Sequence, residues 1–403
     1  MPRDPAASPF TPGYGVLPQV WAGREREFRD FDEVVVPRVR ARTYEQARLI
    51  TGNRGVGKTV LLTQLADEAA DAGDLVAQAT ARTGPSVVAD LVAALATTLH
   101  AASTAAAVTD AIDETLRRRI GLTVSASSVR LDLGASSGAR KRADLDALAT
   151  SLRVLLERTA RVAGDRGRLL LLTIDEAQNA ESAALEVLCH TLADVQNRHD
   201  RTTGPRGEAV RAYLPLAVYL AGLPSLPERI RASGSTFFER ALTFDLGLLR
   251  DPDVAAALHG MLDNAGVGIE PDALDRLVAL IGGYPYFLHL YGKHAWLAGD
   301  DDVLTPAEVE VAAEAAAADL TRFYGERLRG LGDVAYDWLV AAARLPADER
   351  TVGAVAAQLG RTSPQLGSTV ESLIGRALIR HEPGRGRFSF ALPGLDRYLV
   401  TGG

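Results

Sequence analysis

Eight consecutive residues carry the clearest chemistry in the chain: Gly52-Asn53-Arg54-Gly55-Val56-Gly57-Lys58-Thr59, here called the P-loop. They match the pattern G-x-x-x-x-G-K-[ST] at every defined position. Glycines let backbone N–H groups wrap around a phosphate, Lys58 can reach the β- and γ-phosphates, and the Thr59 hydroxyl can bind Mg²⁺. Lysine is rare in this chain, with three among 44 basic residues, so a chance match is unusual. The pattern predicts a site for ATP and Mg²⁺ that continues into Val60.

Two adjacent carboxylates follow the most apolar segment of the chain. Five of the six residues in Leu169–Ile174 are apolar, which is typical of a strand buried on both faces of a parallel sheet. Asp175 and Glu176 come directly after this strand, at the end where such sheets bind ligands. We predict that Asp175 holds Mg²⁺ together with Thr59, and that Glu176 is the general base that polarises the attacking water.

Strands and helices alternate around these residues. Short apolar runs predict strands at 47–51, 75–81, 169–174 and 213–221. Apolar residues at helical spacing predict a lead-in helix at 24–47 and further helices at 59–70, 87–100, 145–163 and 183–195. This alternation is typical of an α/β protein whose parallel sheet is covered on both faces. We expect 104–145 to be a peripheral insertion that includes a hairpin, and 201–208 to be a surface loop.

The composition is that of an ordinary globular protein. Hydrophobic residues make up 47% and charged residues 24%, which excludes wholesale disorder, and 403 residues suggest two or three domains. The net charge of −7 gives no overall attraction for nucleic acid, so DNA contact would require a local basic patch. No apolar stretch approaches the ~18 residues that span a membrane. Without a signal-peptide pattern, we expect a cytoplasmic protein with no membrane partner and a buried, unpaired Cys189.

Beyond residue 250 the pattern is helical. Three helices are expected within Val254–Ala298, followed by one long Ala-rich helix over Pro306–Arg329. Helices at 333–344, 352–359 and 363–374 then precede two short strands around Pro383-Gly384. This order is typical of a winged helix-turn-helix.

Together these motifs resemble the AAA+ ATPases. The strand end Ala221-Gly222-Leu223-Pro224 and the segment Gly282-Gly283-Tyr284-Pro285 follow the P-loop and Asp175-Glu176 in the order found in that family. Upstream, Trp21-Ala22-Gly23-Arg24-Glu25 resembles the family's adenine-side entry box. The likeness is to the STAND-like and origin-recognition-like branch, and within it to actinobacterial ATP-binding proteins with a C-terminal winged helix.

The resemblance implies further site residues. Gly23, Arg24 and Pro285 would bind the nucleotide with the P-loop, and Arg240 would reach the γ-phosphate bound by a neighbouring subunit. We therefore expect a homo-oligomer or a protein partner. Two positions depart from the family pattern. Ser225 is the nearest hydroxyl to the polar sensor position, and Tyr286 stands where many relatives have a sensor arginine. These departures predict ATP hydrolysis that is slow or stimulated by a partner.

The chain is therefore expected to have four parts: an extended arm over 1–20, an AAA+ P-loop core over 21–250, a helical lid over 251–318 and a winged-helix domain over 319–403. The leading hypothesis is an ATPase that uses ATP binding and hydrolysis as a conformational or assembly switch. The alternative is a nucleotide-gated DNA-binding or scaffolding protein that hydrolyses little ATP.

The winged helix has two possible roles. It could pack on the ATPase core, or it could bind DNA phosphates through arginines at Arg361, Arg376, Arg385 and Arg387. The predicted recognition helix, 363–374, is nearly free of basic residues, which is unfavourable for the DNA role.

Overall fold

The structure is a computed structural model that describes residues 3–13, 15–82, 87–125, 128–131, 139–204, 206–235 and 237–401. The chain divides into two compact units. Unit 1 consists of Met1–Arg24, Asn53–Gly57 and Gly247–Gly403, and unit 2 consists of Glu25–Gly52 and Lys58–Leu246. The predicted boundaries of arm, core, lid and winged helix stay predictions.

Unit 2 is built on a five-stranded parallel sheet of order β2-β5-β8-β1-β9. The strands are β1 (Arg48–Gly52), β2 (Leu75–Thr80), β5 (Leu170–Asp175), β8 (Leu216–Gly222) and β9 (Leu242–Leu246). The α/β prediction is confirmed, but β9 was not predicted. It lies at the sheet edge, with Thr243 and Asp245 exposed between half-buried or buried neighbours, so it lacks the apolar run of β5 and β8.

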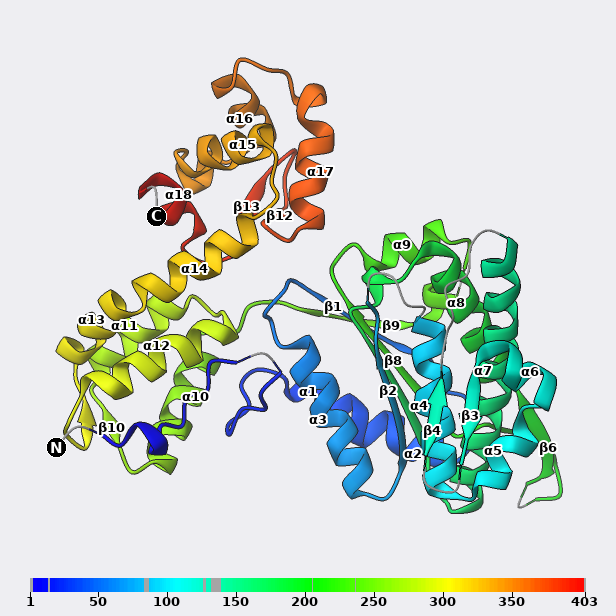
Figure 1. The fold of residues 1–403 in the computed structure, drawn as a ribbon. Coiled ribbons are helices and arrows are strands. Elements are labelled where there is room, and N and C mark those ends of the chain that lie inside the picture. The colour runs from blue at the N-terminus through cyan, green and yellow to red at the C-terminus, as the bar shows by residue number, and fades with distance from the viewer. Residues whose placement is uncertain are drawn as a thin grey trace. The chain divides into compact units, whose positions relative to one another are not determined.

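Helices cover both faces of this sheet (Figure 1). On one face lie α1 (Glu25–Arg29), the π-helical turn Asp30–Val35, α2 (Val36–Arg40) and α3 (Lys58–Asp71). On the other lie α4 (Val87–Ala102), α7 (Ala139–Asp165) and α8 (Ser182–Gln196), whose apolar side chains join Leu170, Leu172 and Ile174 in one core. Because both faces are covered, every residue of β1, β5 and β8 is buried. Cys189 of α8 is buried in this core and has a free thiol, as predicted.

Two segments of unit 2 lie outside the main sheet. The insertion contains α5 (Ala105–Ala111), α6 (Glu114–Ile120) and an antiparallel hairpin of β3 (Leu122–Val124) and β4 (Val129–Leu131), as predicted. The predicted surface loop at 201–208 is correct only in part. A second hairpin pairs β6 (His199–Thr203) with β7 (Ala209–Tyr213), so 201–203 belong to a strand, whereas 204 and 206–208 lie between the two strands. The hairpin is exposed along most of its length, so its strands need no apolar alternation and look like a polar loop in the sequence.

The Gly247–Gly403 part of unit 1 begins with three helices, as predicted: α10 (Asp251–Asn264), α11 (Pro271–Ile281) and α12 (Pro285–Ala298). The same part of the chain contains a two-stranded parallel sheet, formed by β10 (Gly268–Ile269) and β11 (Val303–Leu304). The prediction of a single long helix at 306–329 is wrong. This segment forms two helices, α13 (Pro306–Ala315) and α14 (Ala317–Leu328), which are divided at the fully buried Ala316.

The C-terminal part of unit 1 has the winged-helix order expected from the sequence. Its helices are α15 (Asp333–Ala343), α16 (Val352–Gln358), α17 (Gly367–Gly375) and α18 (Leu395–Thr401), with a 3₁₀ turn at Ser363–Leu366 before α17. The wing pairs β12 (Ile379–His381) with β13 (Phe388–Phe390) in antiparallel register.

The N-terminal arm packs against the helical part of unit 1, the unit to which it belongs. Arg3 is buried and donates to the Asp301 and Val303 carbonyls at 2.8 and 3.0 Å, and it pairs with Glu308. Phe10 is 2% exposed and occupies the space next to Gly292 of α12. The sequence predicted an extended arm over 1–20. A 3₁₀ turn at Pro5–Ala7 interrupts it, and nothing in the sequence indicated this packing.

His289 of α12 should make stability depend on pH. The backbone N–H of Thr11 donates to His289 Nδ1 at 3.3 Å, and burial lowers the pKa of His289 from 6.5 to about 4. Between these values the unfolded chain binds more protons than the folded one, so stability falls as the pH drops through this window. The loss from His289 is at most about 3 kcal/mol. Urea unfolding at pH 4.5 and 7 should show a smaller pH effect in His289→Asn, and an equal effect in both proteins would contradict this assignment.

Candidate nucleotide-binding site

The P-loop connects the buried strand β1 to helix α3. Gly55 and Gly57 have φ values of +82° and +97°, in the left-handed region that favours glycine. Lys58 opens α3 and is 5% exposed, and its Nζ donates to the Gly52 carbonyl at 2.8 Å. The ammonium group is therefore folded back toward the end of β1. Half-buried Val60 follows in the first turn of α3, whose N-terminal N–H groups favour a bound anion.

Thr59 and Asp175 meet in unit 2. The Thr59 hydroxyl donates to Asp175 Oδ2 at 2.6 Å, and the Glu176 backbone N–H donates to Asp175 Oδ1 at 2.8 Å. Burial raises the pKa of the Asp175 carboxyl, and these two hydrogen bonds oppose the increase. A hydroxyl and a carboxylate are hard oxygen donors, and Mg²⁺ typically uses one or two such protein ligands while it keeps several waters. The pair therefore fits the predicted metal site.

Glu176 is held by a residue that the sequence analysis missed. Gln178 lies in the 3₁₀ turn Ala177–Asn179, and its amide nitrogen donates to Glu176 Oε2. Its amide oxygen accepts from the Leu223 backbone N–H at 3.0 Å, just after β8. Glu176 itself has a left-handed backbone, with φ +50° and ψ +33°, and such strained non-glycine residues cluster at active sites. The one sequence feature that could have indicated a role for Gln178 at this site is its position two residues after Glu176.

In unit 1, the P-loop segment Asn53–Gly57 is bound through its backbone. The Tyr284 hydroxyl donates to the Arg54 carbonyl at 2.6 Å, and burial raises the pKa of Tyr284 to about 12, so it stays a neutral donor. A Cβ at Gly55 would lie 2.1 Å from the Tyr284 oxygen, so this position requires glycine. Pro285 follows as the first residue of α12. Tyr284 belongs to the motif Gly282-Gly283-Tyr284-Pro285, but its contact with the loop was not predicted.

Of the entry-box residues, Arg24 contacts this loop. Arg24 donates to the Val56 carbonyl at 2.9 Å and to the Gly247 carbonyl at 3.0 Å. Gly23 has φ +62°, and a Cβ there would lie 2.8 Å from an Asp253 carboxylate oxygen. Of the remaining P-loop side chains, Val56 is buried, Asn53 is half-buried and Arg54 is exposed.

Arg240, the residue expected to reach the γ-phosphate of a neighbouring subunit, belongs to unit 2. Arg240 ends the 3₁₀ turn Phe237–Arg240 and is exposed. Within the described residues, no hydrogen bond or ion pair joins it to Thr59 or Asp175. Arg229, on α9 (Leu226–Ala232), donates to the Ala180 carbonyl at 2.9 Å. Tyr286 stacks on Phe323, with centroids 5.2 Å apart and an interplanar angle of 13°.

Two parts of the chain match known protein families. Residues 20–202 match the AAA ATPase domain, and residues 321–399 match a domain of unknown function, DUF8462. No curated protein matches the chain significantly. The chain therefore carries an AAA ATPase domain with an α/β P-loop fold. Its finer placement in a STAND-like or actinobacterial group stays a prediction.

Solved structures share this fold. The Walker-type ATPase PABY2304 of Pyrococcus abyssi is 16% identical with a TM-score of 0.59, over 94% of this chain and 96% of that one. The ORC2 protein of Aeropyrum pernix, solved as ADPNP–ADP complexes, is 14% identical with a TM-score of 0.57, over 97% of this chain and 95% of that one. At such low identity the likeness concerns the fold alone. In the part of the chain that the structure describes, no helix has the length and apolarity to cross a membrane.

Proposed function

We propose that this protein binds ATP with Mg²⁺ and hydrolyses it slowly, and that the nucleotide state acts as a conformational or assembly switch. The observation that carries the proposal is the hydrogen bond between Thr59 and Asp175. It places the Thr59 hydroxyl oxygen 2.6 Å from a carboxylate oxygen of Asp175, and both oxygens could bind the metal. Mg²⁺ bound there would neutralise charge on the phosphate oxygens. Lys58 would exchange the Gly52 carbonyl for the β- and γ-phosphates, which accept stronger, charge-assisted hydrogen bonds.

Glu176 is the proposed general base. Its carboxylate would orient the attacking water and accept its proton, and Gln178 would fix the carboxylate through the Oε2 contact. Because Gln178 is also bound by the Leu223 N–H, the catalytic carboxylate is coupled to the end of β8. Slow turnover is supported by Tyr286, a neutral aromatic residue at the position where relatives carry an arginine.

A switch requires that the phosphate-binding loop be coupled to another element. In unit 1, Tyr284 binds the Arg54 carbonyl directly before α12, and Arg24 binds the Val56 carbonyl. A change in the loop backbone on phosphate binding would therefore alter the hydrogen bond that Tyr284, directly before the lid helix α12, makes to the loop. This contact supports a nucleotide-dependent change in the lid.

The alternative function is a DNA-binding or scaffolding protein that hydrolyses little ATP. It is favoured by Arg361 and Arg385, which are exposed in the winged helix and have no side-chain partner among the described residues. Arg376, also expected to contact DNA, instead donates to the carbonyls of Arg329 and Gly330 at 3.1 and 2.9 Å. Helix α17 contains no basic residue, which still disfavours DNA recognition through it.

The assembly part of the proposal is tested with Arg240→Ala. If Arg240 completes the site of a neighbouring subunit, the variant should keep ATP affinity and lose at least about tenfold in phosphate release. Light scattering should show that wild type self-associates with ATP and Mg²⁺. Arg231→Ala is the matched control, since Arg231 is an exposed arginine of α9 with no side-chain partner in the described chain. A wild-type monomer in every nucleotide state, or equal turnover in both variants, would contradict the assembly role.

A further inference from the structure

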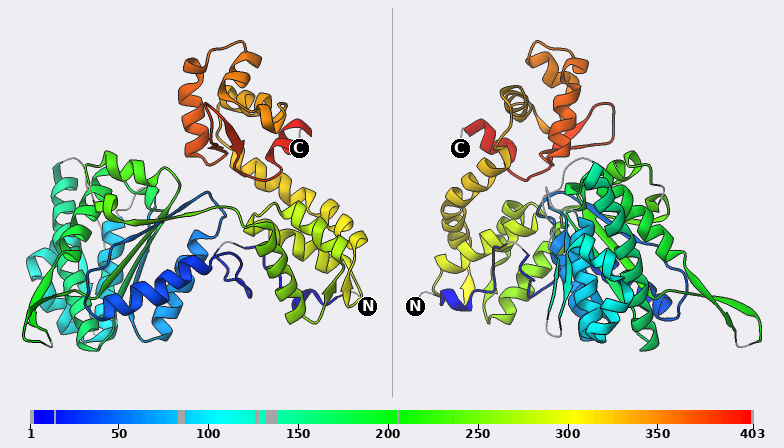
Figure 2. Two further views of the ribbon diagram at one scale, coloured as in Figure 1. Left: turned by 180° about the vertical axis from the view of Figure 1, so that it is seen from behind. Right: turned by 45° about the vertical axis from the view of Figure 1, so that its right-hand side comes forward.

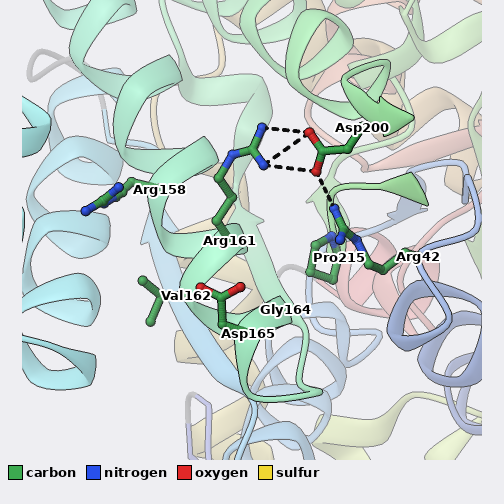
Figure 3. Close-up of a pocket in the computed structure, with 8 residues that line it drawn as sticks. All are labelled: Arg42, Arg158, Arg161, Val162, Gly164, Asp165, Asp200 and Pro215. Atoms are coloured by element: carbon green, nitrogen blue, oxygen red, sulfur yellow. Dashed lines mark hydrogen bonds and ion pairs between the residues drawn. The ribbon is translucent and has the colours of Figure 1, made fainter. Parts of the chain in front are cut away.

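The hairpin of β6 and β7, residues 199–213, is here called the ribbon, and its base is bound to the rest of unit 2 by hydrogen bonds and ion pairs, here called the clamp. The Tyr213 N–H donates to the Arg42 carbonyl at 2.8 Å, and Arg42 Nε donates back to the Tyr213 carbonyl at 3.1 Å. Asp200 accepts from Arg42 at 2.7 Å and from Arg161 of α7 at 3.0 to 3.3 Å (Figure 3). These guanidinium groups, Arg161 foremost, lower the pKa of Asp200. The ribbon therefore leaves the domain in a fixed direction.

Beyond this clamp the ribbon extends past the helices of unit 2, as the green hairpin at the right-hand side of Figure 2 shows. The pocket in Figure 3 lies at the amino-terminal ends of the neighbouring strands, since Pro215 directly precedes β8 and Asp165 precedes β5. The P-loop and Asp175 lie at the opposite, carboxyl ends of the strands. The ribbon is thus separate from the nucleotide site.

Two arginines face one another on the ribbon. Arg201 and Arg211 are directly opposite in the antiparallel register, so their side chains share one face, and both are exposed. Neither has a hydrogen-bond or ion-pair partner for its side chain among the described residues. The other residues of this face are uncharged or histidine: the pairs His199–Tyr213 and Thr203–Ala209. Like charges directly opposite are destabilising, so this pair costs stability unless an anionic partner binds it.

The composition of the ribbon decides between classes of partner. Protein interfaces have an apolar core rich in aromatic residues, whereas nucleic-acid interfaces are polar and positively charged. Val210 is the ribbon's exposed large hydrophobic residue, and it lies on the other face. A two-stranded ribbon also has the width that the major groove of a duplex admits.

We propose that the ribbon is a nucleic-acid-binding arm that docks on duplex DNA, with Arg201 and Arg211 bound to backbone phosphates. It supplies a local basic patch on a chain whose net charge is −7. The proposal depends neither on the winged helix nor on ATP hydrolysis.

The test uses the full chain and a labelled DNA duplex, with anisotropy measured between 50 and 200 mM salt. The double substitution Arg201→Gln/Arg211→Gln should weaken binding about tenfold and lower the salt slope by about two units. The matched control is Arg29→Gln/Arg119→Gln, which removes the same charge from two exposed helical arginines that lack side-chain partners in the described residues. It should bind as wild type does. Unchanged ATP affinity, measured by calorimetry, shows that the ribbon variant is folded.

Three results would overturn the proposal. Wild type could show no salt-sensitive binding to the duplex, or the ribbon and control variants could lose duplex affinity equally. In the third, Arg385→Gln/Arg387→Gln abolishes duplex binding while the ribbon variant keeps wild-type affinity. If the ribbon substitutions abolish self-association and leave DNA binding intact, the partner of the ribbon is a second copy of the chain, and the DNA assignment is wrong.

Asp200→Asn tests the clamp. Asp200 is a positioning residue, so its loss should weaken duplex binding severalfold while the salt slope stays that of wild type, because both phosphate-binding arginines remain. Asp200→Glu keeps the charge and should restore part of the affinity. Wild-type affinity in Asp200→Asn would overturn the role of the clamp.

Discussion

Lys58→Ala should weaken ATP binding by more than about tenfold. A hydrogen bond from a charged group contributes ~1.5–3 kcal/mol, and about 1.4 kcal/mol corresponds to a factor of ten. Lys58 is buried next to Gly52, where its ammonium can move from a backbone carbonyl to phosphate oxygens without leaving the loop. Alanine also leaves the Gly52 carbonyl without this donor. Calorimetric titration with ATP and Mg²⁺ measures the change directly.

The control is Lys293→Ala, which removes the same charge from an exposed position on α12. It should bind ATP as wild type does. Circular dichroism must show that Lys58→Ala is folded. A folded Lys58→Ala protein with undiminished ATP affinity would exclude the P-loop as the nucleotide site.

Features that depend on neighbouring residues were predictable from the sequence. The P-loop is one continuous segment, and its glycines are required by local backbone angles, as the positive φ values of Gly55 and Gly57 show. Asp175 could be placed because a strand covered on both faces is continuously apolar, so its end is visible in the sequence. The alternation of such strands with helices then gave the α/β class.

Features that depend on long-range contacts were not predictable. Gln178 positions Glu176 because it also binds Leu223, which lies 45 residues after Gln178 in the chain. Tyr284 reaches the Arg54 carbonyl across 230 residues, and a tyrosine before a helix gives no local sign of that contact. The strand pairing of the ribbon was not predicted, and 201–203 were assigned to a loop, because the order of the ribbon comes from the clamp between Asp200, Arg42 and Arg161 rather than from apolar residues in the strands. Propensity and periodicity carry no information on such ion pairs.

Glu176→Gln should separate hydrolysis from binding. The substitution keeps the size of the side chain, and the new carbonyl oxygen can still accept from Gln178, so the local structure should be retained. It removes the basic oxygen, and general base catalysis typically contributes 10²- to 10⁴-fold. We therefore expect ATP affinity near that of wild type and single-turnover phosphate release slower by about 100-fold or more.

The decisive comparison adds Gln178→Ala and a control, Glu186→Gln, which changes an exposed acid of α8. Because Gln178 only positions the base, Gln178→Ala should slow release less than Glu176→Gln does, and it should add little when combined with it. If the double variant is scarcely slower than Glu176→Gln alone, both residues act through one group. Residues that act independently would each slow phosphate release by their own factor, and the two factors would multiply. Glu186→Gln should release phosphate at the wild-type rate. If Glu176→Gln does so as well, another group activates the water, and the strained backbone of Glu176 serves only to present Asp175.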